Sequence, residues 1–150
     1  MPRAASDVYF QLFNEIGILE QLSRAVLEAK LPDGMLSSHF GVLNHLARLK
    51  DGQSPNELAR AFQVPKTTMT HTLAGLKKND LVKILPHPRD KRSKCVWLTD
   101  KGRRFRETAI HSLRPDFEKL SKQFSPKDVK VLLPHLEALR IIMDAQRDGE

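Results

Sequence analysis

The middle of this chain, from residue 54 to residue 102, places two helical segments and a hairpin in succession with almost no connecting loop. The sequence Ser54-Pro55-Asn56-Glu57 is a strong helix start. Ser can cap the free N–H groups, Pro suits the first helical position, and Glu completes a capping box. The turn Gln63-Val64-Pro65 ends this helix, and the next is expected from Lys66 to Lys78. This order predicts a helix-turn-helix.

The second helix of the pair separates apolar from polar side chains. Met69, Leu73 and Leu76 recur at spacings of four and three and should face the core. The opposite face carries small polar and cationic side chains: Lys66, Thr67, Thr70, His71 and Lys78. Such side chains can approach base edges and phosphates, whereas a solvated helix face is the plainer interpretation. We call this segment the reader helix.

The next segment has the pattern of a β-hairpin with a basic tip at residues 87–94. Residues 81–85 and 94–98 alternate well enough to be its arms. The side chains expected on the inner face are Val82, Ile84, Val96 and Leu98. Those expected on the outer face are Leu85, Cys95 and Trp97. A hairpin in this position makes the winged form of the helix-turn-helix, which places one helix in a DNA major groove and a cationic finger beside it.

Positive charge is concentrated in the same stretch. Residues 60–104 contain twelve lysines and arginines against three aspartates, a net charge of +9. The whole chain has a net charge of +7, so the remaining residues sum to −2. A nearly neutral scaffold with one basic patch is the electrostatic footprint of a protein that binds a polyanion. Its coincidence with the helix-turn-helix favours DNA over an incidental basic surface.

Amphipathic helices are expected on both sides of this core. Apolar residues recur at helical spacing over about 7–30 and 37–49. After Thr99, a long helix is expected from about 100 to 124, weakened or kinked near Pro115. The last helix should begin at the capping signature of residues 125–128 and run to about 145. Pro134 should kink or break it.

The predicted fold is mainly α-helical with a small β-hairpin wing. The 150 residues should form one domain, with a winged helix-turn-helix core at about 37–100 and dimerisation helices at about 7–30 and 104–147. The apolar stripes of the terminal helices are wider than a single winged domain needs. A symmetric partner would bury the surplus, which predicts a homodimer.

Other classes of function lack the residues to carry them. The sequence contains no nucleophile–base pair, Gly-rich phosphate loop or metal-ligand spacing, so we predict no enzyme activity, no metal and no cofactor. Its apolar runs are far short of a membrane span, and no signal-like run opens it. These features predict a cytoplasmic protein with no membrane partner.

Two alternatives remain open, a protein-docking module and a redox-sensing regulator. A winged helix can be a protein-docking module, which would need an apolar exposed face rather than concentrated charge. The single cysteine, Cys95, could instead be a redox sensor, because Lys94 beside it could lower its pKa. No resolving thiol accompanies it, so a small strand residue is the favoured interpretation.

The wing and its exit, Pro88-Arg89-Asp90-Lys91-Arg92 through Leu98-Thr99-Asp100-Lys101-Gly102, resemble the MarR (multiple antibiotic resistance regulator) family of bacterial transcription factors. The segments Leu58-Ala59-Arg60-Ala61-Phe62 and Thr68-Met69-Thr70-His71 look like the family's central helices. The resemblance extends over nearly the whole chain. The chain departs from the family pattern at Pro65, usually a capping Ser, at Asp80, usually Gly, and at Gly75, usually a longer side chain.

The resemblance implies roles for individual residues. Arg92 would enter or line the minor groove, Asp90 would orient the loop, and Thr70 and His71 would lie where base or phosphate contacts are common. The full predicted DNA-binding set is Lys66, Thr67, Thr70, His71, Lys78, Arg89, Asp90, Arg92 and Lys94. The family further implies a repressor that binds double-stranded DNA as a homodimer on a pseudo-palindromic operator. A small phenolic or carboxylate effector between the dimerisation helices and the core would release it.

Overall fold

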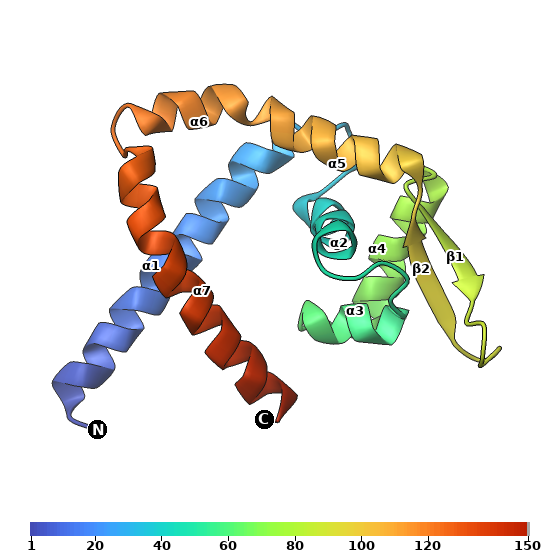
Figure 1. Ribbon diagram of the computed structural model, residues 1–150, viewed down its shortest axis with the longest axis horizontal. Coiled ribbons are helices and arrows are strands. Elements are labelled where there is room, and N and C mark those ends of the chain that lie inside the picture. Colours follow the sequence, from blue (N-terminus) through green and yellow to red (C-terminus); the bar gives the residue numbers. More distant parts are fainter. Residues whose placement is uncertain (150) are drawn as a thin grey trace. The chain divides into compact units, whose positions relative to one another are not determined.

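The computed structural model describes residues 1–149 and divides into two compact units, which are described separately. The first, Met1–Leu113, contains the predicted helix-turn-helix and wing (Figure 1). Its elements are α1 (Arg3–Glu28), α2 (Ser37–Arg48), α3 (Pro55–Ala61), α4 (Lys66–Lys78), β1 (Val82–Pro86), β2 (Lys94–Leu98) and α5 (Asp100–Ser112). The second unit contains α6 (Arg114–Ser121) and α7 (Pro126–Asp148). The predicted fold class, mainly α with a hairpin wing, is confirmed.

The helix-turn-helix forms where its capping signals predict. Ser54 Oγ accepts the Glu57 N–H at 3.1 Å, and Pro55 occupies the first helical position of α3. The turn reverses the chain through a left-handed Gln63, with φ of 55°. The reader helix α4 then begins directly after Pro65, which has no side chain able to cap it. Its bounds, Lys66–Lys78, are those predicted from the sequence.

The core of the first unit lies between α2, α3, α4 and the hairpin. Met69, Leu73 and Leu76 of the reader helix are buried in it, as their spacing predicts. The largest fully buried side chains are Leu43, Leu46, Leu58, Leu76, Leu81, Val42 and Val96. Each such side chain contributes about 1.5–3 kcal/mol when it leaves water. This packing fixes the reader helix against α2 and α3 and leaves its other face exposed.

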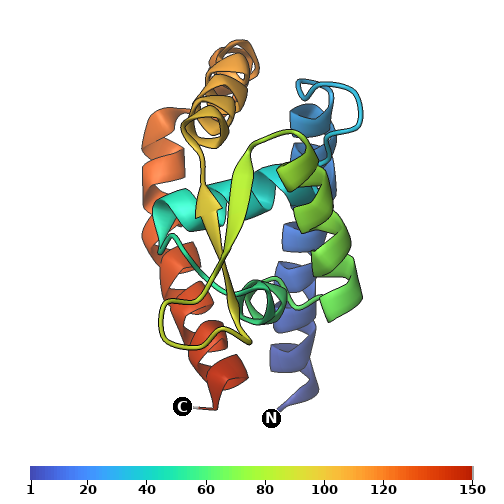
Figure 2. The same ribbon diagram turned by 90° about the vertical axis from the view of Figure 1, so that its right-hand side faces the viewer.

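The hairpin has the predicted register, with Val82 opposite Leu98 and Ile84 opposite Val96 on the inner face. Figure 2 views it from the outside, in front of α2 and α3. A bridge between Gln53 and Val96 adds a third, short segment to its base. Cys95 lies opposite Leu85, on the predicted outer face, but it is buried whereas Leu85 is exposed. Strand alternation predicts the side of the sheet but not what covers that side.

The turn from α4 into β1 contains a residue in the left-handed region. Asp80, in place of a glycine, has φ of 57°. The Thr99 hydroxyl donates to the Asp80 carbonyl oxygen at 2.6 Å and accepts the Gly102 N–H at 2.9 Å. The Thr99 side chain therefore stabilises the turn at Asp80 and caps α5. It links the start of the hairpin to the helix that follows it.

The helix expected over 100–124 is two helices. α5 ends at Ser112, Leu113 is the joint, and α6 begins at Arg114. Pro115 lies in the first turn of α6, where its missing N–H costs no helical hydrogen bond. Proline therefore favours a new helix start here rather than a kink within one long helix.

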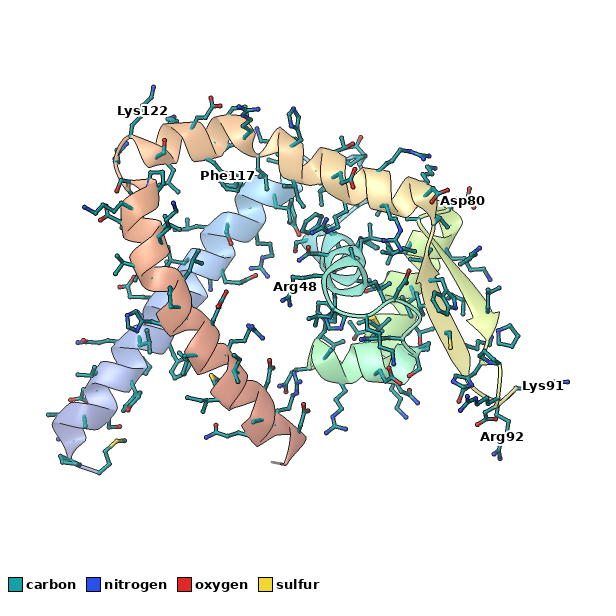
Figure 3. The ribbon with its side chains drawn as sticks, in the orientation of Figure 1. Arg48, Asp80, Lys91, Arg92, Phe117 and Lys122 are labelled. Atoms are coloured by element: carbon teal, nitrogen blue, oxygen red, sulfur yellow. The ribbon has the colours of Figure 1, made fainter. Side chains whose placement is uncertain are left out.

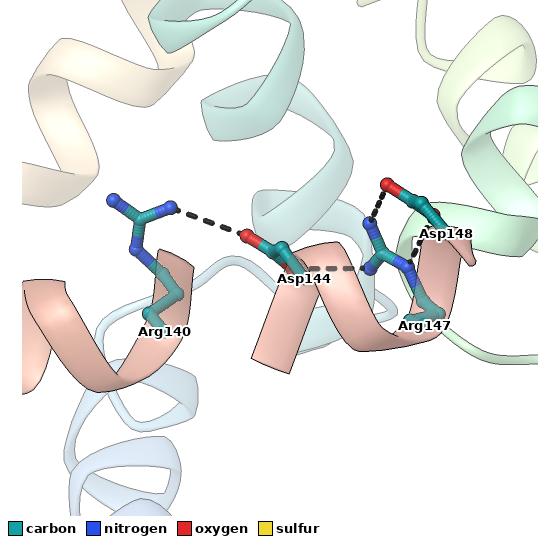
Figure 4. A network of polar contacts seen from close by, with 4 residues as sticks. All are labelled: Arg140, Asp144, Arg147 and Asp148. Carbon is teal, nitrogen blue, oxygen red and sulfur yellow. Dashed lines mark hydrogen bonds and ion pairs between the residues drawn. The ribbon is translucent and has the colours of Figure 1, made fainter. Parts of the chain in front are cut away.

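In the second unit, α7 begins at a reciprocal capping box between Ser125 and Asp128. The helix continues through Pro134, so the alternative of an early break there is wrong. Proline removes one N–H donor, and the long helical stretches on both sides of it retain theirs. Near the C-terminal end, Asp144 pairs with Arg140 and with Arg147, each at 3.3 Å (Figure 4).

No described residue of α1, α6 or α7 is buried. Their exposed side chains include many large apolar ones. In α1 these are Val8, Tyr9, Phe10, Leu12, Phe13, Ile18, Leu19, Leu22 and Val26. In α6 and α7 they include Phe117, Leu120, Val129, Val131, Leu132, Leu133, Leu136, Ile141, Ile142 and Met143. These apolar faces are the surplus that the sequence predicted.

Candidate nucleic-acid interface

The exposed face of α4 presents every reader residue that the sequence singled out. Lys66, Thr67, Thr70, His71 and Lys78 are all exposed. The Thr70 hydroxyl donates to the Lys66 carbonyl oxygen at 2.9 Å, which keeps its oxygen free to accept a further bond. The neighbouring Thr72 is buried and bonds to Thr68 in the same way. Thr72 therefore belongs to the buried side of this helix, whereas Thr70 lies on its exposed face.

The tip of the wing is organised by one aspartate. Asp90 Oδ1 accepts the Arg92 backbone N–H at 3.0 Å and the Arg92 Nε–H at 3.3 Å. The Arg92 side chain is nevertheless 94% exposed, and with Lys91 it points away from the core (Figure 3). His87 and Ser93 close the loop with a backbone hydrogen bond of 2.9 Å. The wing tip is therefore a shaped turn that presents an arginine to solvent.

Arg89 and Lys94 are also exposed at this end of the hairpin, whereas Asp90 is half-buried. The predicted site residues thus lie on two neighbouring elements of the first unit, the outer face of α4 and the hairpin tip. None of them is removed from solvent into the core. The arrangement is a polar helix face beside a long, exposed cationic side chain, which suits contact with an extended anionic surface.

Sequence reasoning missed the residue that fixes the base of the wing. The Asp51 carboxylate accepts N–H groups of Gly52 and Leu98 and the Arg103 guanidinium, each at 3.0 Å. It therefore joins the loop before α3 to β2 and to α5. The Asp51-Gly52 pair that ends a helix in the sequence is the available signal, but its tertiary partners lie about fifty residues away.

Trp97 covers the same junction. Gly52 has φ of 73°, and a Cβ placed there would meet the Trp97 ring at 2.5 Å. The indole therefore packs directly on the glycine backbone, and 38% of the residue remains exposed. The base of the wing is rigid because a carboxylate and an aromatic ring fix it from two sides.

A cavity of about 350 Å³ lies between the reader helix and the hairpin. Its walls are mainly apolar, and two lysines reach its edge. The lining residues are Pro55, Thr70, Leu73, Ala74, Lys77, Ile84 and Lys94. Thr70 and Lys94 belong both to this cavity and to the predicted DNA-binding set.

A buried histidine supports the other side of the reader helix. His39, in the first turn of α2, is 8% exposed. Burial, and secondarily the charge of His71, lowers its pKa below the usual value. Sequence reasoning did not predict a buried histidine here, although His39 shares the helical spacing of the buried Val42 and Leu43, which is the available signal.

Within the described residues, no group of three or more His, Cys, Asp or Glu side chains is placed to hold a metal ion. None of the helices described has both the length and the apolarity needed to cross a membrane. Cys95, at 5% exposed, lacks the solvent access of a reactive thiol. The side chains gathered at the surface are those of a binding face.

Comparison with known proteins agrees with this geometry. Residues 33–93, which span α2 to the wing tip, match the model of the MarR family. The transcriptional activatory protein BadR of Rhodopseudomonas palustris is 27% identical over 146 residues, or 95% of this chain and 81% of BadR. The match therefore includes the flanking helices as well as the core.

Solved structures extend the comparison. A mutant of E. coli MarR in complex with operator DNA is 26% identical, covers 89% of this chain and 96% of its own, and superposes with a TM-score of 0.69. The regulator BldR of Sulfolobus solfataricus shares the fold, with a TM-score of 0.75, 22% identity and coverage of 96% and 99%. These proteins are transcription regulators and not enzymes. Over residues 33–93 by sequence, and over most of its length by fold, the chain is similar to the MarR family of winged helix-turn-helix transcription regulators.

Proposed function

We propose that this regulator binds a pseudo-palindromic operator as a homodimer and represses transcription. The observation that carries the proposal is the joint exposure of the α4 polar face and the wing-tip Arg92 on one compact unit. An α-helix fits the DNA major groove, and an arginine on a neighbouring finger fits the adjacent narrow minor groove. The solved E. coli MarR mutant, which shares the fold, was crystallised with operator DNA.

In each half-site, α4 would enter the major groove with Thr70 and His71 near base edges. Lys66, Thr67 and Lys78 would contact the flanking phosphates from the same helix. The wing would place Arg92 in the minor groove, with Arg89 and Lys94 at phosphates and Asp90 holding the loop. Direct readout would thus come from the helix, whereas the wing would sense groove width and potential.

The dimer would be built from the flanking helices 7–30 and 104–147. α1, α6 and α7 have no buried described residue but carry extended apolar faces. Monomers rarely expose contiguous apolar surface of this extent, and a symmetric second copy would cover it. Two-fold symmetry also matches a pseudo-palindromic site.

Replacing Leu136 of α7 with Glu tests this arrangement, with Lys130→Glu on the same helix as the matched control. Both residues are exposed in the single chain, so a purely monomeric protein should tolerate both substitutions. We expect only Leu136→Glu to shift sedimentation equilibrium towards the monomer mass and to weaken DNA binding. A wild-type protein that sediments as a monomer at micromolar concentration would contradict the proposal.

Selection of bound fragments from random and genomic DNA tests the operator. We expect inverted half-sites with centres about one or two helical turns apart, roughly 10–21 bp, and A·T-rich flanks. Recovery of fragments without a shared motif, or of isolated half-sites, would refute the proposal. Because contacts to phosphates release counterions, the selection should be repeated at two salt concentrations to separate specific from non-specific binding.

The direction of regulation needs its own assay. BadR is named as an activatory protein, so relatives of this chain are not all repressors. A reporter driven by the selected operator region should rise in expression when the regulator is deleted. A fall in expression on deletion would instead identify an activator that binds the same operator.

We further propose that a small aromatic carboxylate or phenol releases the regulator from DNA. The resemblance implies a site between the dimerisation helices and the core, but the cavity that supports this proposal lies elsewhere, between α4 and the hairpin. There Leu73, Ala74 and Ile84 form an apolar wall, and Lys77 and Lys94 can pair with an anion. An occupant would contact Thr70, so ligand and DNA would compete for the same residue. The solved regulator PcaV of Streptomyces coelicolor, which shares the fold at 18% identity and a TM-score of 0.64, was crystallised with its natural ligand.

A panel of phenols and aromatic carboxylates should therefore raise the melting temperature and weaken operator binding together. A ligand acts only through its difference in affinity for the two states. Ala74→Phe should fill the cavity and abolish the thermal shift. Ligands that stabilise the protein without any effect on DNA affinity would exclude the cavity as a regulatory site.

A further inference from the structure

The inner side of the reader helix lies against the ring of His39. A Cβ placed on Gly75 of α4 would lie 2.8 Å from His39 Nε2, closer than side chains pack. Gly75 departs from the longer residue usual in the family, and this contact supplies the reason. The distance between α4 and α2 at this point is therefore set by an imidazole packed on a bare backbone.

The other nitrogen of the same ring holds the start of α2. His39 Nδ1 accepts the Leu36 N–H at 2.9 Å, and the next N–H, that of Ser37, donates to Glu28 Oε1 at 3.0 Å. Only an unprotonated nitrogen can accept, so Nδ1 must carry no proton in this arrangement. Leu36 itself has no side-chain acceptor, which leaves the cap to these two titratable groups. A proton on Nδ1 would place two N–H donors against each other.

We propose that His39 is a positioning residue for DNA recognition, because its neutral ring fixes the start of α2 and the position of the reader helix against α2. Operator affinity therefore requires His39 to remain neutral. The inference rests on the proposed function, since it concerns binding to the operator. Protonation would break the bond to Leu36 and leave a buried cation at the positive end of a helix dipole. The contact between α4 and this ring would then shift or loosen.

The elements packed around α2 carry four charged groups, of which His71 acts against a charge on the ring of His39. From α4, His71 acts against a second positive charge at this place, after burial as the larger cause of the lowered pKa of His39. From α1, Glu28 is engaged by Ser37, and that hydrogen bond lowers the pKa of the carboxyl group. From α5, Arg106 bonds to Asn44 further along α2, and the charged residue of β2, Lys94, lines the cavity beside the wing.

The sign of the effect follows from these shifts. The unfolded chain takes up a proton at this histidine near its ordinary pKa of about 6.5, whereas the folded chain resists it to lower pH. As pH falls through that window, the unfolded state binds more protons and folding stability declines. If only the neutral form binds operator, affinity also falls, by about tenfold for each pH unit below the folded pKa.

Operator affinity should be measured from pH 7.5 to pH 5.0 in a His71→Gln/His87→Gln background. This background removes the two histidines of the reader helix and the wing loop, so that the pH profile reports on His39. With both removed, we expect affinity to fall with pH. Adding His39→Gln should flatten the profile, because glutamine can accept the Leu36 N–H but does not titrate.

A profile that His39→Gln leaves unchanged, or an affinity that does not fall, would overturn the inference. Absence of operator binding at pH 7.5 in the wild type would instead refute the proposed function. Circular dichroism at each pH separates unfolding of the protein from a displacement of the reader helix within the folded protein.

A measurement on the unmodified protein removes the dependence on variants. The C2–H resonance of His39 should be titrated by NMR in the free protein and in the operator complex. Because linkage is reciprocal, DNA should lower the pKa of His39 if binding needs the neutral ring. Phosphate charges alone would raise it. An unchanged or raised pKa in the complex would contradict the proposal.

Discussion

The wing is best tested by three substitutions at its tip, because shape and charge predict different results there. In Arg92→Ala the exposed guanidinium is removed and the core packing stays as it is. We expect affinity to weaken by on the order of 1–3 kcal/mol per half-site, which corresponds to roughly 5- to 150-fold. The slope of log affinity against log salt should also fall, because the variant brings one cation fewer into the groove of each half-site and displaces fewer counterions.

Asp90→Ala separates the two explanations. Removing a negative charge near phosphates should strengthen DNA binding by at most about 1 kcal/mol in water. Against this stand two hydrogen bonds to Arg92, at about 0.5–1.5 kcal/mol each, together with the entropy of a freed loop. Both bonds are solvent-exposed, so the lower part of that range applies. The net expectation is several-fold weaker binding, although the protein becomes more positive.

Asp90→Asn is the matched control. Its side-chain oxygen can still accept the Arg92 N–H, so the turn should persist while the negative charge is removed. A shaped wing predicts binding at or above the wild-type level for Asn and below it for Ala. A wing that acts by charge alone predicts equal gains for both. Fluorescence anisotropy isotherms at several salt concentrations measure these differences, and tighter binding by Asp90→Ala would refute the reasoning.

Three substitutions in the scaffold should change stability in directions that the backbone dictates. Asp80→Gly should raise the free energy of unfolding by about 0.5–1 kcal/mol, because relief of a left-handed residue exceeds the entropic cost of glycine; a decrease in urea unfolding would contradict this. Gly52→Ala should lower the free energy of unfolding by about 1–3 kcal/mol, because the new Cβ would meet the Trp97 ring and the residue has a positive φ. Adding Trp97→Leu should recover part of that loss in the same assay. Asp51→Ala should cost about 1–3 kcal/mol, because the buried Leu98 N–H is left without its acceptor; a melting temperature unchanged by this substitution would show that water replaces the carboxylate.

The sequence predicted most of what local signals determine. The local signals were the N-cap at Ser54, the turn before Lys66 and the alternation of the hairpin arms, and they indicated the bounds of the reader helix and the strand register. Each of these features depends on neighbours within a few residues. Pro115 and Pro134 were harder to interpret, because the effect of proline depends on whether a helix can restart or continue around it.

The features that sequence reasoning missed depend on distant contacts. Asp51 reaches Leu98 and Arg103, and His39 meets Gly75 across thirty-six positions of the chain. A single sequence carries no signal for such pairs, so Gly75 could be recognised as unusual but not explained. Likewise, the side of the strand predicted for Cys95 did not reveal that other residues cover it.

The wing loop has a consequence for how such a regulator can diversify. Its hydrogen bonds run among residues of the loop itself: Arg89 to His87, Ser93 to Asp90, and His87 to Ser93. Its base is held separately, by Asp51 and Trp97. If the wing contacts DNA as proposed, substitutions between residues 87 and 93 should therefore alter which DNA flanks are preferred without altering the core. Transplanting the loop between related regulators should therefore transfer the preference for flanking DNA. Each recipient should keep the sequence preference of its own reader helix in the major groove.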